Sequence, residues 1–171
     1  FGITFSRSPF LPKFQGLPEL LEYPHGCFEQ RTSKLLGYIQ LADLLQYLPA
    51  LGQKHLNYKS TIEGGINYIA QHLNDKGFLS YWPGSSSPNP YVTIQAAWLV
   101  NECQKLNYNI PAGLDEKLQM ALDSIIQGRG RINDHGDLKA FAVFIDSNRS
   151  RSCSKALSKM PKASLSSKSP T

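Results

Sequence analysis

Cys27 and Gln30 are the two residues of this sequence whose types and spacing could do covalent chemistry together. On one turn of a helix, side chains three residues apart have Cβ atoms about 5–6 Å apart, so the Cys27 sulfur can meet the amide carbon of Gln30. If ammonia leaves, a small internal thioester ring remains. Such a ring is strained and electrophilic, and it acylates an amine or a hydroxyl once it is exposed.

The residues just before Cys27 favour a sharp turn into a helix. Pro24 has no backbone N–H and Gly26 has wide conformational freedom. We therefore expect a helix to begin here, with Cys27 in its first turn. A thiol at a helix N-terminus lies at the positive end of the helix dipole, which favours the nucleophilic thiolate.

Spacing alone leaves two other interpretations of these residues open. In the first, Cys27 is a small buried hydrophobic residue and Gln30 an ordinary surface residue. In the second, Cys27 is the nucleophile of a hydrolase with a histidine base, although His25 is too near in sequence to be well aimed and His135 has no defined place. The three Cys and four His residues lack the paired spacing of a zinc site, so we expect no metal.

Five stretches with apolar residues at helical spacing predict the elements that position this motif. They cover about 31–48, 59–74, the residues that follow Pro90, 114–126 and 138–145. Only residues 1–14 begin with strand-like alternation. We therefore predict an all-α fold of antiparallel helical hairpins, with a short N-terminal strand.

Two local features carry further expectations. The Gly64-Gly65 pair lies inside a predicted helix, where each Gly costs about 1 kcal/mol relative to Ala, so another segment should approach closely there. The loop at 74–89 is rich in aromatic residues. We expect these rings to pack against the helix ends rather than to form a platform for a carbohydrate or isoprenoid.

Composition and charge narrow the class of protein. With 171 residues, 41% of them hydrophobic and 18% charged, the chain is neither collagen-like nor wholly disordered. Its net charge of +5 comes from the end: residues 1–146 hold 12 basic and 13 acidic residues, and 147–171 hold six basic residues, nine Ser and no acid. We expect a disordered tail at 147–171 and no nucleic-acid partner.

No stretch reaches the about 18 apolar residues of a membrane-spanning helix. The N-terminus has neither an initiator Met nor a signal pattern. We therefore expect no direct membrane contact from this segment, and the chain looks internal to a longer protein.

The run Pro24-His-Gly26-Cys27-Phe-Glu29-Gln30 resembles the Pro-x-Gly-Cys-x-Glu-Gln thioester motif of the alpha-2-macroglobulin and complement family. The longer run LLEYPHGCFEQRTSKLL is most similar to the bacterial alpha-2-macroglobulins. Two later runs, GFLSYWPGSSSPNPYVTIQAAWLV and CQKLNYNIP, resemble the next landmarks of those proteins. The resemblance covers about residues 3–127 and is absent from the tail.

The resemblance implies a thioester-containing domain, which is an α/α toroid of six helical hairpins when complete. Residues 15–146 would be an incomplete toroid, and 1–14 a strand or linker from a preceding β domain. Cys27 would be the thioester sulfur and Gln30 the acyl donor, with Pro24 and Gly26 shaping the turn and Glu29 assisting ring formation. A complement-type activating His would fall near 118–122, where this chain has none, so direct transfer to amines is expected.

The function implied is that of an endopeptidase inhibitor, which captures a protease covalently in a single turnover and is not an enzyme. No cofactor is implied. The partners would be target proteases and the remaining domains of the parent protein, in the periplasm, the cell envelope or outside the cell. The alternatives are the Cys-nucleophile hydrolase and a degenerate α/α-toroid binding module in which the thioester never forms.

Overall fold

The computed structural model describes residues 26–45, 58–129 and 136–149. These residues form five helices, namely α2 (Phe28–Leu45), α4 (Tyr58–His72), α5 (Pro90–Lys105), α6 (Leu114–Ile126) and α7 (Gly136–Asn148). The described ranges contain no strand, only an isolated antiparallel bridge between Ser80 and Pro88. The all-α prediction is confirmed for this part of the chain. None of the described helices is long and apolar enough to cross a membrane.

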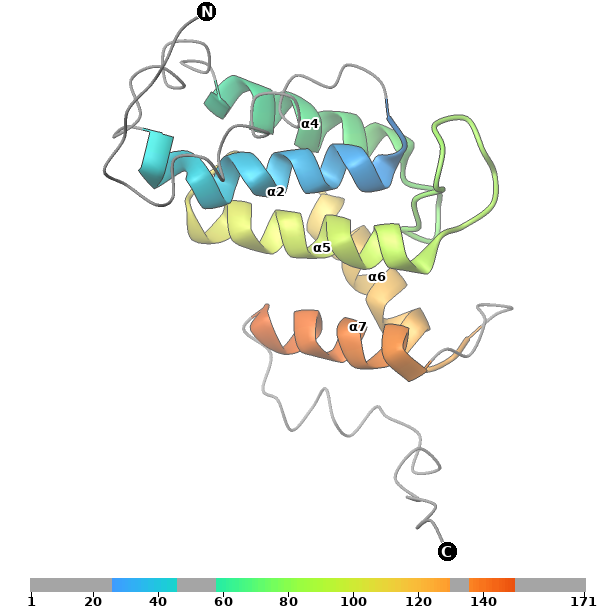
Figure 1. Ribbon diagram of the computed structural model, residues 1–171. Helices are drawn as coiled ribbons and strands as arrows, with labels where there is room; N and C mark the ends of the chain where they lie inside the picture. Colours follow the sequence, from blue (N-terminus) through green and yellow to red (C-terminus); the bar gives the residue numbers. More distant parts are fainter. Residues whose placement is uncertain (1–25, 46–57, 130–135, 150–171) are drawn as a thin grey trace, which may run out of the picture.

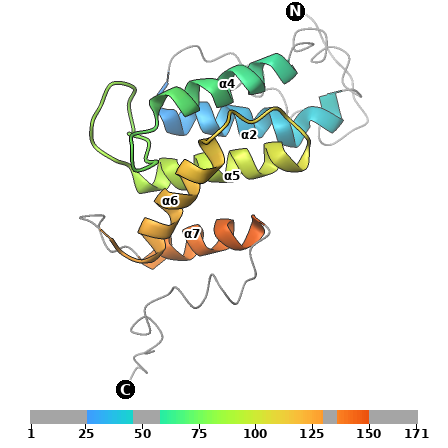
Figure 2. The same ribbon diagram turned by 180° about the vertical axis from the view of Figure 1, so that it is seen from behind.

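Helix α5 is the centre of the assembly. It packs against α2, α6 and α7, while α4 packs against α2 and α7 against α6. Helices α2 and α5 run in the same direction, with α4 running in the opposite direction beside α2 (Figure 1). From behind, α6 crosses α5 steeply and leads to α7 (Figure 2). The start of α2, the end of α4 and the start of α5 therefore lie at one end of the molecule.

The start of α5 is fixed by its local sequence. The Asn89 side chain accepts a hydrogen bond from the Val92 N–H at 3.1 Å, and Pro90 occupies the first helical position. Both features are typical of a stable helix N-terminus. Ten of the sixteen residues of α5 are buried, which matches its central place.

One glycine of the α4 pair permits the close approach of another segment that its sequence predicted. A Cβ atom on Gly65 would lie 2.4 Å from Cδ1 of Leu35, whereas one on Gly64 would meet nothing within 4 Å. The close approach between α4 and α2 therefore depends on Gly65 alone. Leu35 and the α4 residues Ile62, Ile66 and Ile69 are buried at this interface.

Several predicted boundaries need correction. Helix α2 begins at Phe28 rather than near 31, so Cys27 lies one residue before the helix and not inside its first turn. Helix α7 continues to Asn148, two residues into the segment predicted to be a disordered tail. The predicted strand at 1–14, and the rest of the tail from 150 onward, lie outside the described residues.

Candidate functional site

Cys27 occupies the capping position of α2. Its carbonyl accepts the N–H of Arg31 at 3.1 Å, which is the first hydrogen bond of the helix. The next amide, that of Phe28, donates to the backbone carbonyl of Tyr81 at 2.9 Å. A loop distant in sequence therefore provides a hydrogen-bond acceptor for an amide that usually has no partner within the helix. The Cys27 side chain is only 2% exposed.

Gln30 is exposed, yet its side chain folds back over Gly26. If Gly26 carried a Cβ atom, this atom would lie 2.7 Å from Oε1 of Gln30 and 3.5 Å from its amide carbon. It would also lie 3.1 Å from Cβ of Gln30, which cannot swing away as the end of the side chain can. A glycine at position 26 therefore makes room for the carboxamide beside the residue that precedes Cys27.

Glu29 lies beside the thiol. The Cys27 thiol donates to Oε2 of Glu29 at 3.9 Å, and the Ser33 hydroxyl donates to Oε1 of the same carboxylate at 3.3 Å. Ser33 thereby limits the rotation of the carboxylate and keeps one of its oxygens directed toward the sulfur. This arrangement provides a proton acceptor for Cys27.

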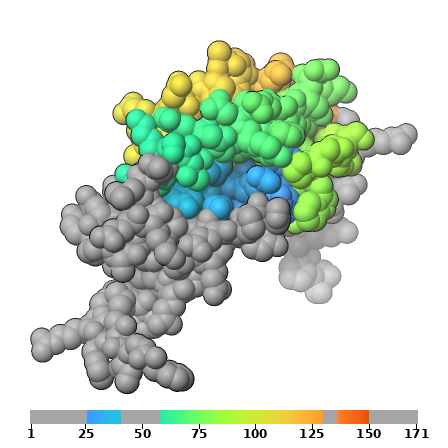
Figure 3. All heavy atoms as spheres, turned by 90° about the horizontal axis from the view of Figure 1, so that it is seen from above, coloured from blue at the N-terminus to red at the C-terminus, as the bar shows by residue number. Residues whose placement is uncertain are grey.

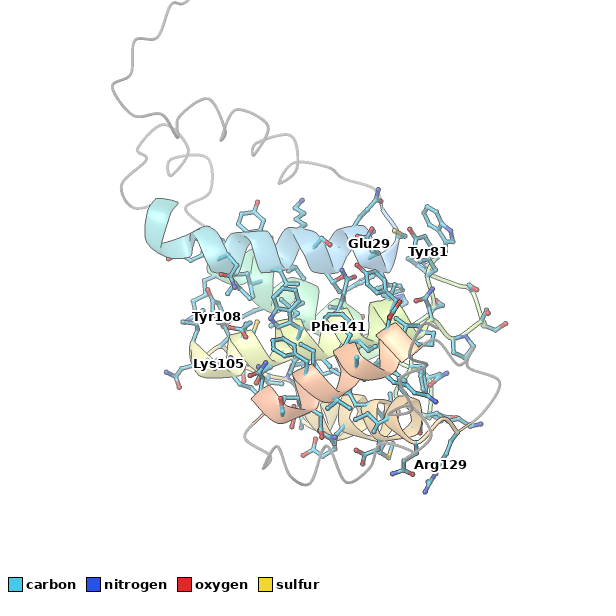
Figure 4. The ribbon with its side chains drawn as sticks, turned by 60° about the horizontal axis from the view of Figure 1, so that its bottom comes forward. Glu29, Tyr81, Lys105, Tyr108, Arg129 and Phe141 are labelled. Atoms are coloured by element: carbon cyan, nitrogen blue, oxygen red, sulfur yellow. The ribbon has the colours of Figure 1, made fainter. Side chains whose placement is uncertain are left out.

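The loop between α4 and α5 covers the thiol from the other side. The Tyr81 hydroxyl lies close to Cys27, and its hydrogen bond to that residue, together with the electrostatic effect of Cys27, raises the pKa of Tyr81 above its usual value. Trp82 stands edge-on to Tyr81, with ring centroids 5.6 Å apart. In Figure 3 the lime-coloured end of this loop lies against the blue start of α2, and Figure 4 shows Tyr81 and Glu29 at the same end of the molecule.

Of the clustered aromatic residues that were expected to pack against helix ends, Phe78 is buried, whereas three others leave much of their surface exposed. Tyr81, Trp82 and Tyr91 are 39%, 57% and 42% exposed. Sequence analysis missed the contact of Tyr81 with Cys27, because 54 residues separate them and no pattern marks the pairing. The only available signal was the density of aromatic residues in the loop.

A second missed feature lies behind the motif, between α2 and α5. The Thr32 hydroxyl is fully buried, 2.8 Å from the Phe28 carbonyl and 3.2 Å from Oε1 of Gln95. Gln95 in turn donates to the Tyr91 hydroxyl at 3.2 Å. Buried polar side chains are stable when they are hydrogen-bonded, so this chain of contacts fixes the first turn of α2 relative to the start of α5.

Some of the residues considered in the sequence analysis cannot be placed. Pro24, His25 and His135 lie outside the described residues. Within the described ranges, the side chains that contact Cys27 are those of Glu29 and Tyr81, and no cluster of His, Cys, Asp and Glu could hold a metal ion. Cys103 is fully buried, and burial raises the pKa of its thiol to about 12.

A cavity lies at the opposite end of the helices. It has a volume of about 510 Å³ and is lined by residues that include Tyr58, Lys105 and Tyr108. Figure 4 shows Lys105 and Tyr108 far from Glu29 along the helix bundle. The cavity is therefore separate from the Cys27 site.

The chain is similar to two curated bacterial proteins. It is 28% identical over 123 residues to "Alpha-2-macroglobulin" of Xylella fastidiosa, covering 71% of this chain and 7% of that protein. It is 26% identical over 144 residues to "Alpha-2-macroglobulin homolog" of Yersinia pestis, covering 83% of this chain and 7% of that protein. The chain thus spans 7% of the length of the relatives it matches. No family model matches the sequence.

A solved structure shares the fold. It is the native alpha-2-macroglobulin of Escherichia coli, spanning the residues from domain MG7 to the C-terminus, with a TM-score of 0.65, 20% identity and coverage of 84% of this chain and 24% of that one. At this identity the likeness shows the fold alone. Together with the two sequence relatives, it confirms the resemblance to bacterial alpha-2-macroglobulins that the motif predicted.

Proposed function

We propose that this chain, as a relative of the bacterial alpha-2-macroglobulins, carries an internal thioester between Cys27 and Gln30. In this proposal the chain is part of an α/α toroid in a larger protein, which inhibits endopeptidases by capturing them covalently. The observation that carries the proposal is the position of the Gln30 carboxamide, which folds over Gly26, the residue directly before the buried Cys27.

Formation of the thioester joins the sulfur of Cys27 to the amide carbon of Gln30. The C–N bond of the carboxamide breaks, and the thiol proton leaves with the nitrogen as ammonia. Glu29 is suited to this transfer, because its Oε2 accepts from the thiol at 3.9 Å. In our proposal Glu29 takes the proton from sulfur and passes it to the departing nitrogen.

Capture reverses the direction of acyl transfer. An amine of the target protease attacks the thioester carbonyl, the carbon–sulfur bond breaks, and the sulfur leaves as a thiolate. The amine loses a proton, and an amide bond then links the protease to residue 30. The site is consumed in one turnover, so we propose an inhibitor and not an enzyme. Its partners are the target protease and the other domains of the parent protein, and the periplasm or cell envelope is the proposed location.

The loop that contains Tyr81 supports the requirement that the sulfur remain dry. Tyr81 contacts the thiol with its hydroxyl and the first amide of α2 with its carbonyl. Gln30 remains exposed on the other side of the motif. We propose that another domain of the parent protein covers Gln30 until a protease cuts elsewhere and uncovers it.

The thioester is tested by the intact mass of the full-length native protein before and after methylamine treatment. We expect the mass to be lower than the sequence predicts by one ammonia, and to rise by one methylamine as a free thiol appears at Cys27. Gln30→Ala and Cys27→Ala should each abolish both changes, because each removes one end of the bond. Cys103→Ala is the matched control and should leave both changes intact.

The competing hydrolase predicts a different result. An enzyme that uses Cys27 as its nucleophile would retain its full mass and would tolerate Gln30→Ala. An untreated protein with a full-strength thiol at Cys27 and an unmodified Gln30 would therefore rule out the thioester.

A further inference from the structure

Arg31 holds both peptide groups that flank Cys27. Its backbone N–H donates to the Cys27 carbonyl at 3.1 Å, and its side-chain Nε donates to the Gly26 carbonyl, also at 3.1 Å. The first bond orients the peptide that follows Cys27 and the second orients the peptide that precedes it. Since these two peptide planes define φ and ψ of Cys27, one residue fixes the direction in which its side chain leaves the backbone.

The Arg31 side chain is itself held in place by α4. Its guanidinium carbon lies 4.7 Å from the centre of the Tyr68 ring, within the range of a cation–π interaction. Tyr68 packs in turn on His72, at 4.1 Å between ring centroids, and on Phe28, at 5.7 Å. A planar guanidinium can stack on a ring and donate through Nε at the same time, which the flexible ammonium of a lysine does less well.

The reacting carboxamide meets the same peptide. Gln30 folds over Gly26, with its amide carbon 3.5 Å from the place where a Cβ would stand, while Arg31 binds the carbonyl of that residue. We propose that Arg31 is a positioning residue for thioester formation, and that its contact with Gly26 aligns the Cys27 sulfur with the amide carbon of Gln30. This inference rests on the proposed thioester.

The test compares variants of the full-length protein by the ratio of molecules that have lost ammonia to those that have not. Arg31→Ala should lower this ratio about tenfold, the size expected when one hydrogen bond from a charged group is lost. Arg31→Lys should recover part of the loss, because it keeps the charge but not the planar stack. Arg129→Ala is the matched control, because Arg129 is exposed and distant from the site, and it should leave the ratio unchanged.

A second pair of variants removes the support and leaves Arg31 in place. Tyr68→Phe keeps the ring face and should match the unsubstituted protein, whereas Tyr68→Leu removes it and should lower the ratio several-fold. Protection of Cys103 from alkylation reports folding in every variant. A purely structural role would reduce this protection and the thioester together, while a positioning role reduces the thioester alone.

The outcomes separate the two proposals. If the unsubstituted protein has lost no ammonia, the thioester is overturned and the role of Arg31 with it. If that protein carries the thioester and a folded Arg31→Ala variant carries as much, only the role of Arg31 is overturned. If Arg31→Ala does not fold, the Tyr68 pair decides, and equal ratios in Tyr68→Leu and Tyr68→Phe overturn the proposal.

Discussion

The two cysteines of the described core are both buried, but their surroundings differ. Cys27 is 2% exposed and lies at a helix start between the Glu29 carboxylate and the Tyr81 hydroxyl. Cys103 is fully buried on the inner face of α5, where desolvation raises the pKa of its thiol to about 12 and the charge of Glu102 adds to the effect. Burial therefore does not distinguish the cysteine of the proposed thioester from the cysteine of the apolar core. The difference lies in the polar groups that a second segment brings to the sulfur.

The largest expected effect is the protection of Cys103. Raising a thiol pKa from 9.0 to about 12 lowers the thiolate fraction about 1000-fold at neutral pH, since each unit is a factor of ten. We therefore expect Cys103 in the native protein to be alkylated at least about 1000-fold more slowly than in the denatured chain. Mass analysis of tryptic peptides after timed iodoacetamide treatment measures both rates. Similar alkylation rates of Cys103 in the native and the denatured protein would contradict the proposed difference between the two cysteines.

The same shift gives the sign of a pH effect. Below pH 9 the Cys103 thiol is neutral in both the folded and the unfolded chain, so its contribution to stability is constant. Between pH 9 and about 12 the unfolded chain ionises first, and stability falls as pH rises. Cys103→Ala should flatten this part of the stability curve.

The second largest effect should come from substitution of Gly77, where the loop that covers Cys27 packs against the backbone of α6. Gly77 has φ of +79°, and a Cβ there would lie 1.9 Å from the backbone carbonyl oxygen of Lys117. Gly77→Ala should cost about 3 kcal/mol of stability or displace the loop. Displacement would expose Cys27 and leave Cys103 protected. Urea unfolding, and alkylation of Cys27 in a Gln30→Ala background, distinguish these results.

Gly84 provides a matched control for Gly77 in the same loop. Its φ is +84°, but an added Cβ would meet nothing within 4 Å. Gly84→Ala should therefore cost only the about 1–2 kcal/mol of a left-handed backbone, with no change at Cys27. An equal loss of stability in Gly77→Ala and Gly84→Ala would mean that the close approach of Gly77 to α6 has no effect on stability.

The smallest expected effect is a change in thermal stability on substitution of the glycine pair of α4, which contacts neither cysteine. Gly65→Ala places a methyl 2.4 Å from Cδ1 of Leu35, and overpacking of this kind costs about 1–3 kcal/mol. Gly64→Ala meets nothing within 4 Å and should stabilise the protein by about 1 kcal/mol through helix propensity. Thermal melts of the two variants should shift in opposite directions. Shifts of the same sign would contradict the close approach of α4 to α2.

Sequence alone predicted the helices well, because each carries apolar residues at a regular spacing. The Pro90 start of α5 and the Leu114–Ile126 bounds of α6 agree with the predicted segments. The end of α7 was less predictable. There Arg149 bonds to the Ala97 carbonyl and to Asp115, so contacts with α5 and α6 extend order into a segment whose composition alone favours disorder.

The candidate site was predictable only where it is local. Cys27, Glu29 and Gln30 are close in sequence, so their proximity follows from helix geometry. Tyr81 and Tyr68 reach the motif through the packing of α4 and the following loop, and no periodicity in the sequence encodes those contacts. The thioester itself remains a prediction.

The loop over Cys27 contacts three different helices. At Gly77 it rests on the backbone of α6, and at Tyr81 it binds the first amide of α2. With only three residues between these attachment points, the loop has almost no slack. Leu79, midway between them, donates its N–H to the Thr93 hydroxyl of α5 at 3.1 Å, so the cover of the sulfur is built on three helices that lie far apart in the sequence.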